Sequence, residues 1–201
     1  MAIFLIRHGE TVLNAARIVQ MPDTPLSPRG RAQAERLARR LAGEGIGLIL
    51  SSDLPRARMT AECLRDTTGA PIALDPGLQE RNFGEVRGQP YSALGVDLLA
   101  PDFEPPGGEP WAEFYARVDA VWQRIAAAAA AAAGSLAVVT HGLVCHALLE
   151  RHLAVPEGSV RAIWGNASLT VVEAAPPWRV RLLNCTRHLD EELEAGSSPA
   201  V

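Results

Sequence analysis

Short apolar segments that each end abruptly in polar residues constrain the fold of this chain more than any other feature. Residues 2–6, 47–50 and 136–139 are apolar runs of strand length, and segments with the apolar spacing of helices lie between them. Strands that alternate with helices predict an α/β domain with a largely parallel sheet. We therefore expect a three-layer α/β/α sandwich with a mostly parallel central sheet.

Capping and turn residues predict where several helices begin and end. Ser27 followed by Pro28 predicts a helix that ends before Gly43, and Pro55 predicts one that ends before Gly69. Apolar periodicity predicts two further helices, and short apolar runs predict three further strands. The expected helices are residues 111–133 and 143–153, and the expected strands are 71–74, 168–173 and 179–183, the last two as an antiparallel pair.

The length of 201 residues favours one domain. We expect this domain to span residues 1–189. A small cap is expected near residues 82–110, where glycine and proline are frequent, and a disordered tail over residues 190–201. These expectations place a single catalytic or binding site within one α/β unit.

The charge and residue counts exclude several classes of function. The net charge of −4 argues against a nucleic-acid-binding surface, and the absence of an apolar run of about 20 residues argues against a membrane span. Three cysteines without a pairing pattern favour a reducing compartment, so we expect a cytoplasmic protein. All 19 basic residues are arginine, which excludes lysine-based Schiff-base and pyridoxal-phosphate chemistry.

Reactive side chains follow the predicted strands directly. Arg7 and His8 follow the first strand, His141 follows the strand at 136–139, and Arg56 and Arg58 open the helix after the second strand. Ligands of such sheets bind at the carboxyl ends of the strands, and a helix N-terminus with nearby arginine favours an anion. A single histidine at a strand end is more often structural, but two in one parallel sheet predict a shared site.

A metal site is not expected. His141, Cys145 and His146 lie close in sequence, but no second cluster completes a zinc-type ligand set. Packing in the core is the simpler interpretation for Cys145. We therefore expect neither a metal nor another cofactor.

An ordered set of motifs resembles the histidine phosphatase superfamily, which includes the phosphoglycerate mutases. The single motif R-H-G is weak, but the ordered set is specific and runs from the first strand to near residue 173. The matching segments are LIRHGET (5–11), DTPLSPRG (23–30), SSDLPRARMTA (51–61), LQERNFG (78–84), VVTHG (138–142) and NAS (166–168).

The resemblance implies a role for each matching side chain. His8 is the implied nucleophile, which forms a phosphohistidine, and Glu80 is the implied proton donor to the leaving group. The implied phosphoryl-binding residues are Arg7, Asn14, Arg56 and His141. The match selects Arg56 over Arg58, a choice that spacing alone leaves open. Arginine and histidine stabilise a transferring phosphoryl group by charge and position, so this chemistry needs no Mg²⁺.

Two departures from the family pattern bear on the reaction. Gln20 stands where the family often has glycine, at the expected rim of the pocket. Where the mutases carry a lysine-containing segment, residues 86–91 read VRGQPY. We therefore expect a phosphomonoester hydrolase acting on a small phosphate ester. A phosphoglycerate mutase and a non-catalytic phosphate-binding regulator are the alternatives.

The identity of the ester and the oligomeric state stay open at this point, with a homodimer as one option. Three aromatic side chains of the expected cap are candidates for shaping specificity: Phe83, Tyr91 and Phe103.

Overall fold

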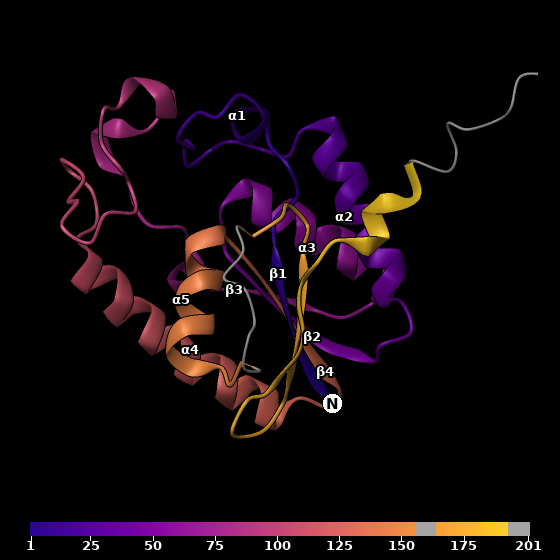
Figure 1. Ribbon diagram of the computed structural model, residues 1–201. Coiled ribbons are helices and arrows are strands. Elements are labelled where there is room, and N and C mark those ends of the chain that lie inside the picture. Colours follow the sequence, from indigo (N-terminus) through magenta and orange to yellow (C-terminus); the bar gives the residue numbers. More distant parts are fainter. Residues whose placement is uncertain (156–163, 193–201) are drawn as a thin grey trace, which may run out of the picture.

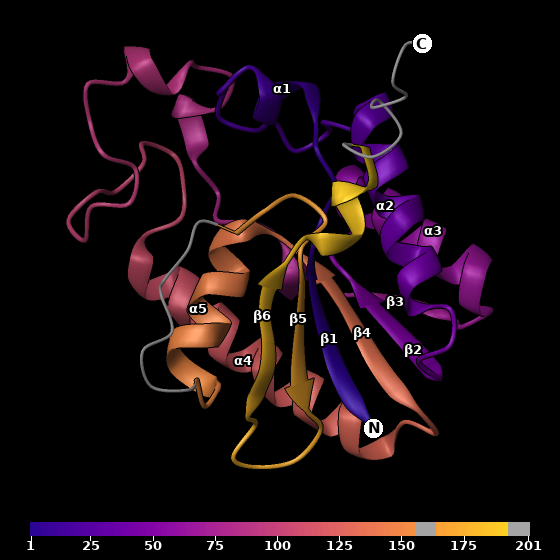
Figure 2. The same ribbon diagram turned by 45° about the vertical axis from the view of Figure 1, so that its right-hand side comes forward.

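A six-stranded sheet runs through the computed structural model, which describes residues 1–155 and 164–192 (Figures 1 and 2). The strand order is β3-β2-β4-β1-β5-β6; β3, β2, β4 and β1 are mutually parallel, whereas β5 and β6 are antiparallel to their neighbours. The strands are β1 (Ala2–Arg7), β2 (Ile46–Ser51), β3 (Ile72–Leu74), β4 (Ser135–Thr140), β5 (Leu169–Glu173) and β6 (Val180–Cys185).

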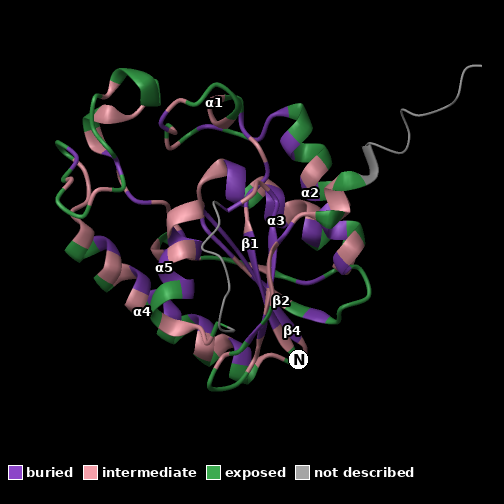
Figure 3. Ribbon diagram, viewed as in Figure 1, coloured by how far each residue is buried: buried purple, intermediate pink, exposed green. Residues whose placement is uncertain are grey.

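Two helices cover each face of the sheet. The alternation of side chains along β1 directs Ile3 and Leu5 toward one helix pair and Phe4 and Ile6 toward the other. The first pair is α4 (Trp111–Ala131) and α5 (Gly142–His152), and the second is α2 (Pro28–Leu41) and α3 (Pro55–Thr68). Buried residues are concentrated in the strands and on the inner helix faces (Figure 3). The predicted three-layer architecture is confirmed.

The capping residues act as predicted. The Ser27 side chain accepts a hydrogen bond from the Gly30 backbone at the start of α2, and Gly69 ends α3 with a φ of 73°. The alanine-rich helix ends at Ala131, two residues before the predicted end. No helix in residues 1–155 or 164–192 is long and apolar enough to span a membrane.

The strand register brings the reactive chain segments to one edge. Arg7 pairs with Thr140 across β1 and β4, and Ser51 pairs with Val139 across β2 and β4. Because these strands are parallel, the residues that follow them emerge side by side at their carboxyl ends.

The cap segment, residues 82–110, is largely irregular and contains the short 3-10 helices Gly84–Val86 and Tyr91–Ala93. Arg81 holds the cap segment in place, because its guanidinium donates hydrogen bonds to the Glu109 and Phe103 carbonyl oxygens at 2.9 and 2.8 Å. It also lies 3.7 Å from the ring centre of Trp111. Arg81 is 1% exposed, and its contacts hold the cap segment in place. The motif that contains Arg81 and the expected acid, Glu80, did not predict this structural role.

Two local differences from the predicted elements have clear causes. A four-residue helix, α1 (Val12–Ala15), was not predicted because a segment this short shows no apolar periodicity. A reciprocal capping box between Thr11 and Asn14 stabilises it. The expected tail begins at residue 190, but Asp190 belongs to the 3-10 helix Arg187–Glu192. The rest of that expected tail, 193–201, lies outside the described residues.

Candidate active site

Two histidines meet where β1 and β4 end. The ring centroids of His8 and His141 are 5.1 Å apart, and both side chains are buried. The turn after β1 requires glycine, since a Cβ on Gly9 would lie 2.4 Å from the carbonyl oxygen of Gly30. The tight turn therefore holds His8 beside its partner from the neighbouring strand.

A backbone contact determines the tautomer of His8. Its Nδ1 lies 2.7 Å from the Gly9 carbonyl oxygen. A carbonyl oxygen only accepts, so Nδ1 carries the proton and Nε2 keeps its lone pair. Burial lowers the pKa of His8 well below 6.5, and the charges of Arg7 and Arg56 lower it further. His8 is therefore a neutral imidazole, and Nε2 is the ring nitrogen that keeps a lone pair.

His141 is held from the opposite side by Ser52. Its Nε2 lies 2.9 Å from the Ser52 hydroxyl oxygen, which also accepts the Leu54 backbone N–H at 3.3 Å. Burial lowers the pKa of His141 well below 6.5. The Ser52 hydroxyl can donate its proton to Nε2 of the neutral ring, and in that tautomer the ring proton is on Nδ1. Ser52 immediately follows β2. The expectation that functional side chains lie at the carboxyl ends of parallel strands, which located the two histidines, therefore also points to Ser52.

Two buried arginines flank His8. Arg56 is 2% exposed and donates to the Met21 carbonyl oxygen at 3.1 Å, while Arg7 donates to the Trp164 carbonyl oxygen. Burial lowers the pKa of Arg56 to about 10, so it keeps its charge at neutral pH. Arg58 points away from the site, is exposed and pairs with Glu62 at 3.5 Å. The arginine selected by the motif is the one inside the site.

Unsatisfied polar atoms gather around His8. Within the described residues, four buried side-chain atoms have no hydrogen-bond partner: Arg7 Nε, Arg56 Nε, His141 Nδ1 and Ser168 Oγ. Leaving a buried donor unpaired costs about 1–3 kcal/mol. Three of the four are N–H donors of residues in the expected phosphoryl-binding set. Their arrangement suits a multiply charged oxyanion, which offers several acceptors at once.

Glu80 stands opposite the histidines with both oxygens oriented by the backbone. Its Oε1 accepts the Arg81 N–H at 3.1 Å and its Oε2 accepts the Leu143 N–H at 3.2 Å. Burial raises the pKa of the carboxyl above 4.5, although these two N–H groups oppose the shift. The Thr140 hydroxyl donates to the Leu78 carbonyl oxygen at 2.7 Å and ties the Glu80 loop to the end of β4.

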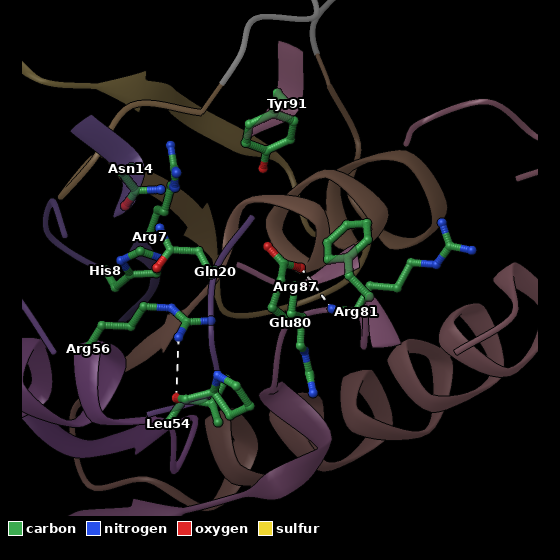
Figure 4. A pocket seen from close by; sticks show the side chains of 12 residues that line it. Arg7, His8, Asn14, Gln20, Leu54, Arg56, Glu80, Arg81, Arg87 and Tyr91 are labelled. Atoms are coloured by element: carbon green, nitrogen blue, oxygen red, sulfur yellow. Dashed lines mark hydrogen bonds between the residues drawn. The ribbon is translucent and has the colours of Figure 1, made fainter. Parts of the chain in front are cut away.

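Amide side chains form the rim near β1. The Asn14 carbonyl oxygen accepts hydrogen bonds from the Thr11 backbone and, at 3.2 Å, from the Asn166 side chain. The Gln20 amide nitrogen donates to the Thr11 hydroxyl at 2.8 Å. Both Asn14 and Gln20 face the cavity, so the residue that departs from the family pattern is part of its wall (Figure 4).

These groups enclose a cavity of about 60 Å³. Arg7, His8, Asn14, Arg56 and Glu80, all expected from the motifs, line it (Figure 4). His141 is not among the residues that line the cavity; its ring contacts that of His8, and its Nδ1 has no hydrogen-bond partner. Arg87 and Tyr91 also line it, and neither had been assigned to the phosphate pocket from the sequence.

Across residues 1–155 and 164–192, no group of three or more His, Cys, Asp or Glu side chains is placed to hold a metal ion. The cationic groups around the cavity are the guanidinium groups of Arg7, Arg56, Arg81 and Arg87.

Known proteins resemble this chain over nearly its full length. The sequence model of the histidine phosphatase superfamily (branch 1) matches residues 3–186. A probable phosphoglycerate mutase GpmB of Yersinia enterocolitica is 32% identical over 210 aligned positions, which cover 94% of each chain.

Solved structures give the same result for the fold. A mycobacterial glucosyl-3-phosphoglycerate phosphatase in complex with VO3 superimposes with a TM-score of 0.79 at 29% identity, covering 92% of this chain and 99% of that chain. A putative alpha-ribazole-5'-P phosphatase from Escherichia coli also has a TM-score of 0.79, at 26% identity, covering 92% and 97%.

Proposed function

The chain belongs to the histidine phosphatase superfamily, and from this membership and its site geometry we propose that it is a metal-independent phosphomonoester hydrolase. The observation that carries the proposal is the environment of His8: a neutral imidazole with a free Nε2, next to arginine N–H groups that have no partner. A phosphoryl group bound there lies next to a nucleophile and accepts hydrogen bonds from those N–H groups.

In the first step, His8 Nε2 attacks phosphorus and the bond from phosphorus to the ester oxygen breaks. The protonated carboxyl of Glu80 gives its proton to that oxygen, so the alcohol leaves in neutral form. Arg7 and Arg56 stabilise the charge on the phosphoryl oxygens. His141 donates a hydrogen bond from its Nδ1–H to one of these oxygens and keeps its proton. This step leaves a phosphohistidine and an ionised Glu80.

In the second step, the Glu80 carboxylate takes a proton from water as the water oxygen attacks phosphorus. The bond between phosphorus and His8 Nε2 breaks, and inorganic phosphate leaves. Glu80 is protonated again and His8 regains its lone pair. The sum is a phosphate ester plus water giving an alcohol plus inorganic phosphate.

Hydrolysis is favoured over phosphoglycerate mutase chemistry by the groups that face the site opening. A mutase must retain a substrate with a carboxylate and protect its phosphohistidine from water. Here Tyr91, within the segment where the mutases carry a lysine, presents its phenol toward Glu80 (Figure 4). A phenol supplies no positive charge for a carboxylate, and the cation of the same segment, Arg87, lines the small pocket together with the phosphoryl-binding groups. The relatives carry both kinds of name, so the reaction type is decided by assay.

The direct test is phosphate release from 4-nitrophenyl phosphate in excess EDTA. We expect turnover by the native protein, at least a thousandfold loss in His8→Ala, and little change in His152→Ala. His152 is a matched control because it pairs with Asp119, away from the cavity. Quenching in detergent at alkaline pH after reaction with ³²P-labelled ester is expected to trap a phosphoprotein in the native chain but not in His8→Ala, and acid treatment should then release the label.

Four outcomes would contradict the proposal. Loss of activity with EDTA would refute a metal-independent reaction, and full activity in His8→Ala would refute the nucleophile. Transfer of the phosphoryl group between positions 2 and 3 of phosphoglycerate, primed by the bisphosphate and without net phosphate release, would identify a mutase. Binding of esters without turnover would identify the regulator.

A further inference from the structure

A second, larger cavity adjoins the phosphate pocket, and residues of α5 and of the cap segment line it. Its volume is about 540 Å³, against about 60 Å³ for the pocket that contains His8. Arg7, Glu80, Phe83 and Tyr91 line both spaces, so the two adjoin at the proposed acid. A volume of this size lies within the roughly 300–1,000 Å³ of small-molecule sites.

We propose that this leaving-group cavity binds the alcohol half of the ester and selects a large, apolar, uncharged alcohol. The inference rests on the proposed phosphatase function, which leaves the ester unspecified.

The position of Glu80 fixes the direction in which the alcohol must extend. The ester oxygen has to reach the Glu80 carboxyl to receive its proton, while the phosphoryl group occupies the pocket beside His8. The remainder of the ester therefore continues past Glu80, on the side away from His8. That side is the leaving-group cavity, which Glu80 also lines.

Apolar side chains form most of its wall. Phe83 and Leu98 are 8% and 4% exposed and belong to one buried cluster, against which Leu143 packs. Val96 and Leu99 are 52% and 59% exposed at the same cavity. Large apolar side chains facing water are stabilised when a ligand covers them, since about 25 cal/mol is gained per Å² removed from water. An apolar alcohol provides that cover.

The charges of the wall disfavour an anionic alcohol. Among the described residues of the wall, the side chain with a permanent positive charge is Arg7, which the proposed mechanism engages with the phosphoryl group. Glu80 and Asp97 also line the cavity, and a carboxylate or second phosphate on the alcohol would face both. Tyr91 and His146 are the other titratable groups of the described wall, and His146 lies 4.0 Å from Glu150. The arrangement therefore selects against phosphoglycerate and bisphosphates.

Binding of phosphonates tests the inference independently of turnover. Benzylphosphonate and (1-naphthyl)methylphosphonate share the anion and differ by one fused ring. We expect calorimetry on the full chain to give a Kd about tenfold lower for the naphthyl compound, since extra apolar surface of this size contributes roughly one to two factors of ten when buried. Equal affinities would overturn the inference.

Surface variants locate the effect. Leu99→Asp is expected to raise the Kd of the naphthyl compound about tenfold and to change that of benzylphosphonate less than threefold. Leu74→Asp is the control, because Leu74 is 49% exposed at the end of β3 and does not line the cavity. Equal effects of the two substitutions would refute this location. Naphthyl selectivity with no hydrolysis of phenyl or 1-naphthyl phosphate would instead refute the phosphatase function alone.

Discussion

Replacing Glu80 by glutamine separates proton donation from every other contribution of this side chain. The amide keeps the size of the carboxyl but has no acidic proton. If Glu80 protonates the leaving oxygen, its loss matters in proportion to the basicity of that oxygen. An alkoxide needs the proton, whereas 4-nitrophenolate leaves without it.

The size of the effect follows from the chemistry and from the two hydrogen bonds at Glu80. General-acid catalysis contributes about 10²- to 10⁴-fold, or about 3–5 kcal/mol of barrier. We therefore expect kcat/KM for an alkyl phosphate to fall by this factor in Glu80→Gln, and for 4-nitrophenyl phosphate by less than about tenfold. Separately, the amide NH₂ must face the Arg81 or Leu143 N–H, which leaves one buried donor unpaired. That cost of about 1–3 kcal/mol lowers Tm by several degrees.

The assay compares kcat/KM for the two esters in native and variant protein, because this ratio reports the steps up to phosphoryl transfer and not the later hydrolysis of phosphohistidine. Glu85→Gln, the same substitution at an exposed position of the cap segment, is the matched control and should leave both values unchanged. An equal loss for the two esters in Glu80→Gln would refute the assignment of Glu80 as the acid.

Further predictions concern charge, pH and ligand binding. Arg56→Ala should lower kcat/KM about 10²- to 10³-fold, as loss of a transition-state donor does, whereas Arg58→Ala should change it less than twofold; similar losses would contradict the placement of Arg56. The pKa of His8 lies below 6.5 and that of Glu80 above 4.5, so kcat/KM should fall below pH 6.5 as His8 gains a proton and on the alkaline side as Glu80 loses one. A pH–rate profile of Glu80→Gln that keeps the alkaline limb would contradict this reasoning. Orthovanadate at a hundred times its Kd should raise Tm by about 5–10 °C in a thermal melt, and the shift at the same concentration should shrink in Arg56→Ala.

Much of the scaffold follows from local patterns along the chain. The apolar runs before Arg7 and His141 predict two strands of one parallel sheet, and the structure places those strands next to each other. Ser27 caps the start of α2 and Gly69 caps the end of α3, by contacts that depend only on neighbouring residues. Such features are predictable because periodicity and capping act over a few residues.

The features that escaped prediction depend on contacts between distant segments. Arg81 is buried because carbonyl groups of the cap segment and the Trp111 ring surround it, and arginine is normally exposed. Of the three aromatic residues expected to shape specificity, Phe83 and Tyr91 line the leaving-group cavity. Phe103 does not line it and instead offers its carbonyl to Arg81. No local pattern separates these outcomes.

The position of β1 between β4 and β5 has a consequence for the newly made chain. The strand that carries the nucleophile is synthesised first, but both of its sheet neighbours come from residues after 134. The backbone oxygen of His8 is itself bound by the Ala167 N–H. A ribosome must therefore have delivered most of the chain before the pocket closes, so a truncated product contains His8 but not the architecture that makes it reactive.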